Sequence, residues 1–213
     1  MIGNYRFSIF FYNALKNILL LLSIICLFQS KVSAQERKLV YDVMRNGKTI
    51  GNINFIELIQ GQKKFISMTS DVKTRFILPF SDNTAETAAY EDDIMVYSSF
   101  YQKQTGSDKA NKTTIVSGKS YKLTDNGVSK LISFSPIRYN MLLLYTTIPE
   151  TISKVYSANF QRLLDIKKIE PNKYRLTLPD GKYNYYTYKN GICTKVEIVR
   201  TLFTLQFVLK EIH

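Results

Sequence analysis

The chain has 213 residues, which is enough for one domain with a sizeable hydrophobic core. Its hydrophobic content of 45% and charged content of 22% are those of a folded globular protein and exclude an intrinsically disordered chain. The formal net charge of +12 comes from scattered Lys and Arg residues with acids between them. This pattern favours a solvated basic surface over a patch for anionic lipid, polysaccharide or nucleic acid.

The N-terminus has the features of an export signal. Arg6 and Lys16 precede an apolar run over residues 18–28, and a small-residue signal-peptidase site ends at Ala34. The apolar run is shorter than the roughly 20 residues that a membrane-spanning helix needs. The order of these features predicts a cleaved signal peptide over residues 1–34, with an uncleaved membrane anchor as the alternative.

Residues 35–213 are expected to form a single exported domain, periplasmic or secreted, with no transmembrane span after cleavage. Lipidation of Cys26 is an alternative way of retaining the chain at a membrane.

Loss of Cys26 with the signal leaves Cys193 as the one cysteine, so no intrachain disulfide can form. The strand-like sequence around Cys193 predicts a buried, unreactive thiol.

Residues 39–55 predict the first β-hairpin. Two apolar-rich runs flank Asn46-Gly47, a dipeptide that accepts positive φ at both central positions of a type I′ turn. Residues 63–80 then alternate apolar and polar side chains with a period of two. This alternation predicts one long, half-exposed antiparallel strand that ends at Pro79.

The rest of the chain is expected to be a meander of strands separated by Gly-, Pro- and Asn-containing turns. Ser81-Asp82-Asn83 has the composition of a turn, and residues 105–110 that of a loop. The further strands are predicted over residues 87–104, 112–116, 120–124, 128–134, 160–169, 173–178, 182–189 and 192–210.

Residues 138–157 differ from the rest of the chain and supply the one expected helical segment. Apolar residues recur at spacings near three and four from Ile137 to Tyr145, which predicts a short helix. Pro149 is favoured at the first position of a second helical turn. The complete pattern predicts a mainly β fold, in which about ten antiparallel strands form a single, strongly curved sheet. We expect an open or half barrel, or a sheet wrapped around the helix, because large open sheets tend to curl.

Few residues are available for catalysis. His213, the last residue, is the sole histidine, which excludes a His-based triad and a multi-His metal site. The sequence has no CxxC pair, no glycine-rich nucleotide-binding loop and no nucleophile elbow. We therefore predict no enzymatic activity, no catalytic or metal-binding residue and no cofactor.

The densest acidic group comprises Glu86, Glu91, Asp92 and Asp93. Paired carboxylates can hydrolyse glycosides or bind calcium. Asp92 and Asp93 are neighbours at the start of a predicted strand, so their side chains point to opposite faces. A solvated turn is therefore favoured, and a hydrolase that uses Glu86, Glu91 or Asp92 is the remote alternative.

Tyrosine side chains crowd the predicted strand 182–189. Tyr183 and Tyr185 share one face, and Tyr186 and Tyr188 share the other. Aromatic residues between lysines can stack on bases or sugars. Core packing on one face and cross-strand pairs on the other are the favoured interpretation.

Two stretches carry a resemblance to a known family. YDVMRNGKTIGNI (residues 41–53) and LPDGKYNYYTYKNGICTKVEI (residues 178–198) resemble uncharacterised exported bacterial β-proteins known only as a domain of unknown function. More distantly, the opening hairpin is similar to that of half-barrels that resemble periplasmic lipoprotein carriers. This likeness implies an unclosed antiparallel barrel with a helix near its mouth, and no reaction or catalytic residue.

These observations predict a non-enzymatic envelope protein whose curved sheet holds an apolar ligand such as a lipid or an acyl chain. The motivation is a large sheet with apolar residues on both faces of several strands and an apolar helix able to cover it. The alternative is a structural module that binds another envelope protein through an edge or a face of the sheet. The ligand-binding residues are not identified by the sequence.

Overall fold

The computed structural model describes one unit over Ala34–His213. The predicted signal peptide, apart from Lys16 and Ala34, lies outside the described residues. No helix within the described part of the chain is long and apolar enough to cross a bilayer. The described residues are 16, 34–75, 79–133, 135–200 and 203–213.

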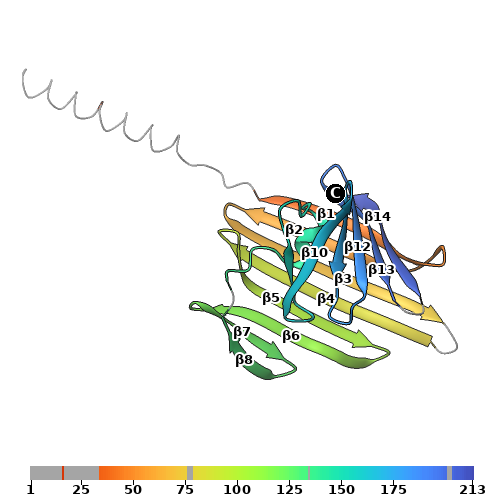
Figure 1. Cartoon of the computed structure of the whole chain (residues 1–213), viewed down its shortest axis with the longest axis horizontal. Helices are drawn as coiled ribbons and strands as arrows, with labels where there is room; N and C mark the ends of the chain where they lie inside the picture. Colours follow the sequence, from red (N-terminus) through yellow and green to blue (C-terminus); the bar gives the residue numbers. More distant parts are fainter. Residues whose placement is uncertain (1–15, 17–33, 76–78, 134, 201–202) are drawn as a thin grey trace, which may run out of the picture. The chain divides into compact units, whose positions relative to one another are not determined.

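The described residues of this unit form one antiparallel sheet of 14 strands and a short 3-10 helix, η1 (Figure 1). The strand order is β8-β7-β6-β5-β4-β3-β2-β1-β14-β13-β12-β11-β10-β9. The chain therefore runs as two meanders, which the pairing of β1 with β14 joins into a single sheet. The elements are β1 (Gln35–Arg45), β2 (Lys48–Gln60), β3 (Lys63–Arg75), β4 (Pro79–Glu91), β5 (Ile94–Gln104), β6 (Ser107–Ser117), β7 (Ser120–Asp125), β8 (Val128–Ile132), η1 (Met141–Tyr145), β9 (Lys154–Ser157), β10 (Arg162–Glu170), β11 (Lys173–Thr177), β12 (Tyr183–Lys189), β13 (Ile192–Val199) and β14 (Thr204–Ile212).

The mainly β, antiparallel and open sheet confirms the predicted fold class, but the expected count of about ten strands is wrong. Residues 63–104 form three strands where two were predicted, because the chain reverses at Asp92-Asp93 with φ of 51° and 59°. Residues 192–210 contain two strands, and β9 was not predicted.

The expected turn at Ser81-Asp82-Asn83 is also wrong, because these residues lie within β4 and pair with β3. The Asp82 carboxylate accepts hydrogen bonds from the side chains of Gln102 and Gln104 on β5, each at 3.1 Å. Short polar residues favour turns only where nothing else satisfies their hydrogen-bonding groups. Here the neighbouring strand does so.

The helical prediction holds only in part. The helix is the five-residue η1, preceded by Asn140, whose side chain accepts a hydrogen bond from Leu143 N. The second helical turn expected after Pro149 is absent from the described structure, where residues 154–157 form β9 instead.

The first predicted hairpin is confirmed, with Asn46 and Gly47 at φ of 48° and 74°.

The inner face of the sheet, defined here as the face that packs against η1, is rich in buried tyrosines. Tyr188 of β12 donates a hydrogen bond to Leu144 O at 2.8 Å, and Tyr139, in the segment before η1, donates to Thr147 O. Thr146, just after η1, donates to the buried Glu57 carboxylate at 3.0 Å. These contacts satisfy buried polar groups and fix η1 against the sheet.

The edges of the sheet are β8 and β9, and side chains link the two regions. Gln161, between β9 and β10, donates from Nε2 to the carbonyl groups of Thr113 on β6 and Thr124 on β7, at 2.9 and 3.0 Å. Lys112 Nζ donates to Asn159 O at 2.7 Å. The sheet thus curves around its interior without closing by strand pairing.

Gly51 offers a test of how closely β2 and β3 approach. A Cβ atom added there would lie 2.2 Å from Asp71 O, whereas one added at Gly47 meets nothing within 4 Å. We expect Gly51→Ala to lower the free energy of unfolding by about 3 kcal/mol through backbone displacement. Gly47→Ala should cost about 1 kcal/mol, because alanine tolerates positive φ poorly. Urea denaturation of both variants measures the difference, and equal losses would contradict this account.

Candidate functional site

A cavity of about 170 Å³ lies between the inner face of the sheet and η1. Most of its wall is apolar and comes from β3, β5, β13, β14 and η1, including Met68, Phe100, Val196, Phe207 and Met141. The volume is comparable to the roughly 150 Å³ of an engineered cavity that accepts benzene. It is below the roughly 300 Å³ at which sites for drug-sized ligands begin. The cavity therefore suits a small molecule or a short apolar segment.

Glu86 is the acidic residue among the described residues of this wall. On β4 it lies between Met68 of β3 and Phe100 of β5, and it shares the inner face with Ala88 and Tyr90. Its side chain is buried, and Oε1 has no hydrogen-bond partner among the described residues. Burial raises the pKa of Glu86 from 4.5 to about 8, so the carboxyl group is mainly uncharged at neutral pH.

A second polar group of the wall comes from the C-terminal half of the chain. Asn184 and Tyr186 are buried and alternate with partly buried neighbours on β12, which places both on the inner face, where their side chains hydrogen-bond each other. Arg200, after β13, donates from Nη1 to Asn184 Oδ1 at 3.4 Å and to Val199 O at 2.9 Å. Burial lowers the pKa of Arg200 from its ordinary value. The cavity thus has an uncharged acid and a guanidinium group in a mainly apolar wall that also includes the polar side chains of Ser157, Asn159 and Asn184.

The structure does not bring the predicted acidic residues together. Glu86 faces the interior from the middle of a strand, so its assignment to a solvated turn is wrong. Glu91 ends β4, is exposed and pairs with Lys63 at 3.4 Å. Asp92 and Asp93 form the exposed turn that follows, as expected for a solvated turn.

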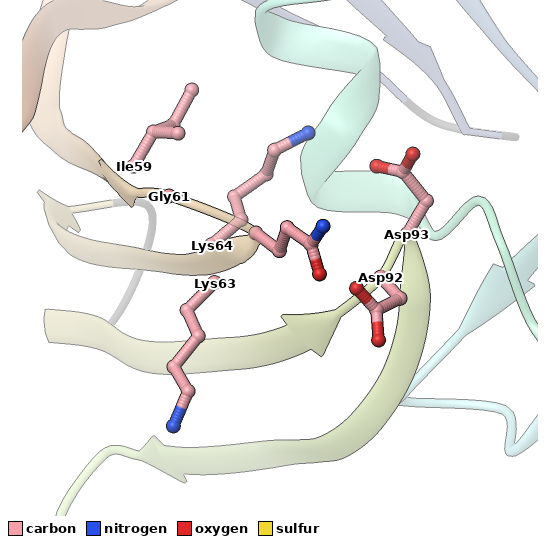
Figure 2. Close-up of a pocket in the computed structure, with 7 residues that line it drawn as sticks. Ile59, Gly61, Lys63, Lys64, Asp92 and Asp93 are labelled. Atoms are coloured by element: carbon pink, nitrogen blue, oxygen red, sulfur yellow. The ribbon is translucent and has the colours of Figure 1, made fainter. Parts of the chain in front are cut away.

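The turn at Asp92-Asp93 lines a hollow of about 450 Å³ with the turn between β2 and β3. Figure 2 shows Lys63 and Lys64 pointing in opposite directions beside it. The backbone of the two turns is joined by one hydrogen bond, from Asp92 N to Gln62 O at 3.2 Å. The acids of this hollow are exposed, so water satisfies them. We therefore interpret the hollow as solvated surface.

The tyrosines of β12 are placed as predicted. Tyr186 and Tyr188 are buried in the core, and Tyr183 and Tyr185 lie on the opposite face. Outer-face cations cover these two rings: Arg175 lies 4.5 Å from the Tyr183 ring centroid, and Lys173 Nζ lies 5.6 Å from that of Tyr185. The rings therefore form cross-strand pairs with their neighbours.

The remaining candidates supply no further chemistry. Cys193 is fully buried, as predicted, and burial raises the pKa of its thiol to about 12, which keeps it unreactive. His213 is exposed, with Nε2 3.2 Å from Glu211 Oε2. No group of three or more metal-ligating side chains occurs within the described ranges.

Sequence reasoning missed Asn184 and Arg200. Asn184 could have been found, because the alternation that places Tyr186 and Tyr188 inward also places Asn184 inward. Arg200 gave no such signal, since the end of β13 was hidden inside one long predicted strand.

The sequence also matches a known family profile, which describes a domain of unknown function (DUF6134) and covers residues 41–210. The chain belongs to this family. The resemblance to a family known only as a domain of unknown function is thereby confirmed. No curated protein matches the DUF6134 chain.

A solved structure shares the fold of this DUF6134 chain. It is the crystal structure of a β-barrel-like protein of a domain of unknown function, DUF1849, from Brucella abortus. The superposition has a TM-score of 0.54 and 8% sequence identity, and covers 84% of this chain and 97% of the other. At that identity the likeness concerns the fold alone.

Replacing Glu86 with Gln should remove a pH-dependent loss of stability. In the unfolded chain the carboxyl ionises near pH 4.5, whereas in the folded chain its pKa is about 8. The free energy of unfolding of the wild type should therefore fall as the pH rises through this interval, because ionisation stabilises the unfolded state first. The advantage of Glu86→Gln over the wild type should grow by up to about 5 kcal/mol.

Urea denaturation at several pH values between about 4 and 9 measures this difference. Burial raises the pKa values of the tyrosines that interact electrostatically with Glu86, so they stay neutral over this range; they are Tyr90, Tyr145, Tyr156 and Tyr186. Glu91→Gln, at the exposed end of the same strand, is the control and should show a much smaller change. A pH-independent difference for Glu86→Gln would contradict the assignment.

Proposed function

We propose that this protein is an exported, non-enzymatic envelope protein that holds a small, mainly apolar ligand between its curved sheet and η1. The observation that carries the proposal is the 170 Å³ cavity, whose wall combines apolar side chains with the unpartnered carboxyl of Glu86. Small-molecule sites typically have this composition: mostly hydrophobic residues with a few placed polar groups.

The arrangement of acids supports a binding role over hydrolysis. Glycoside hydrolysis requires two carboxyl groups on either side of the scissile bond. Within the described wall Glu86 has no carboxylate partner, and Glu91 and Asp92 are exposed at the end of β4. This argues against glycoside hydrolysis at Glu86 and favours a recognition role for this residue.

The size of the cavity limits what is held. Tyrosines and η1 fill most of the interior, so the space suits a small molecule or the end of one acyl chain more than a whole lipid. The ligand proposed here is therefore smaller than the lipid expected from the sequence.

A tryptophan introduced at Ile198, a partly buried residue of the cavity wall, should block binding. We expect the affinity for octan-1-ol, measured by calorimetry, to fall at least about tenfold because the indole occupies the ligand volume. The control Val199→Trp points outward from the adjacent position and should bind within about twofold of the wild type. Equal octan-1-ol binding by both variants would contradict the proposal.

Mass spectrometry of protein purified from its native host should also detect a small copurifying molecule.

A second candidate function is protein binding through the edge strand β8. Val128 and Leu131 are 76% and 67% exposed, and β8 pairs with β7 alone among the described strands. Ile115 on β6 lies on the same face as Leu131, with Lys122 of β7 between them. Exposed apolar edges can accept a strand from another chain.

Leu131→Lys tests this second candidate. The charge should abolish capture of a specific envelope protein in pull-downs from envelope extracts, because it disrupts the apolar edge. Val199→Lys, exposed on the distant strand β13, should retain capture. Identical recovery with both variants would exclude β8 as the interface.

A further inference from the structure

We infer that the cavity selects a short-chain carboxylate whose aliphatic chain also bears a hydroxyl group. The carboxylate would pair with Arg200, the chain would lie against the apolar wall, and the hydroxyl would hydrogen-bond Glu86. This inference rests on the proposed function and names the chemical class of the ligand.

The first part of the ligand follows from Glu86. An uncharged carboxyl both donates and accepts hydrogen bonds, and Oε1 has no partner among the described residues although it lines a cavity. Leaving such a buried group unsatisfied is costly, so a ligand that supplies the partner gains affinity from it. A hydroxyl group matches both capacities, whereas an alkyl chain matches neither.

The second part follows from Arg200. Both hydrogen bonds that its side chain makes with described residues use Nη1. Nε and Nη2 make no hydrogen bond with described residues, and the carboxylate that interacts electrostatically with Arg200 is the exposed Asp180, which water screens. These donors can serve a ligand, because a guanidinium group pairs with a carboxylate through two parallel hydrogen bonds. The bond to Asn184, which also lines the cavity, holds the guanidinium group at the wall.

The third part follows from the wall between these polar residues. Met68, Val196 and Phe207 belong to β3, β13 and β14 and offer no charged group to a ligand. An aliphatic chain can pack against them through dispersion contacts and lose its contact with water.

Other ligand classes fit less well. A simple fatty acid would leave Glu86 without a partner. A simple alcohol would offer Arg200 no carboxylate inside the cavity, and Asp180, its electrostatic partner, is exposed to solvent. A cationic ligand would be repelled by Arg200 and would require Glu86 to ionise in a buried environment, which its raised pKa disfavours.

The test compares three series of about four to eight carbons, a range set by the cavity volume. They are hydroxyalkanoates substituted along the chain, unsubstituted alkanoates and 1-alkanols, titrated calorimetrically into wild type and variants. The best hydroxyalkanoate should bind at least about tenfold more tightly than the matched alkanoate and alkanol, because it satisfies both polar groups.

The variants assign each end of the ligand. Arg200→Gln should weaken both carboxylate series at least about tenfold and leave the alkanols unchanged. Glu86→Leu should remove the preference for the hydroxyl group, while Glu86→Gln should retain part of it because an amide also donates and accepts. Arg175→Gln and Glu91→Gln replace the same residue types outside the cavity and should behave as the wild type.

The outcomes separate this inference from the function on which it rests. If alkanols bind and Ile198→Trp blocks them, but hydroxyalkanoates show no advantage in the wild type, the ligand class is wrong and the proposed function stands. Unchanged carboxylate affinity in Arg200→Gln would also overturn the inference. If no series binds the wild type, both fail. Should Glu86→Leu not fold, the wild-type comparison and Glu86→Gln still decide the role of Glu86.

Discussion

The fold depends on the pairing of the first strand with the last. Leu39 lies opposite Ile212 and Val43 opposite Phe207, and Lys38 and His213 exchange two backbone hydrogen bonds of 2.9 Å. Every other pair in the sheet joins two strands that are consecutive in the sequence. Without β1–β14 pairing the chain would be two separate meanders with four exposed edges. Since this contact closes a loop of nearly the whole domain, it also carries the largest entropic cost of all the strand pairs.

The curved sheet created by this pairing must fill its interior, and it does so with large aromatic side chains and the segment that carries η1. Tyrosine combines a large apolar ring with a hydroxyl that needs a partner. The backbone around η1 supplies such partners, since Tyr139 and Tyr188 donate to its carbonyl groups. The same segment links β8 to β9, so one stretch of chain connects the two meanders, covers the inner face and forms part of the cavity wall.

Glu86 is one of several buried residues with a polar side-chain atom that lacks a hydrogen-bond partner among the described residues, as are Ser98 and Asn140, and of these Glu86 lines the cavity. Buried polar groups in native proteins usually have hydrogen-bond partners, and local violations of such rules tend to occur at functional sites. Arg200 reaches the same cavity from the other meander. A recognition site shared by β4 and the end of β13 would therefore exist only when β1–β14 pairing has brought the two halves together. The DUF6134 family and the DUF1849 neighbour are consistent with the fold and assign no activity to it.

The sequence alone determined the strand-rich class, the antiparallel meander, the turn at Asn46-Gly47 and the inward placement of Tyr186 and Tyr188, because side-chain alternation and turn composition are local properties. It could not determine that Ser81–Asn83 would extend a strand, since that depends on partners from β5. Nor could it show that residues 39 and 212 would meet. The tertiary structure alone placed Glu86, Asn184 and Arg200 around one cavity. Their burial and proximity arise from long-range strand pairing, for which the sequence carries no local signal.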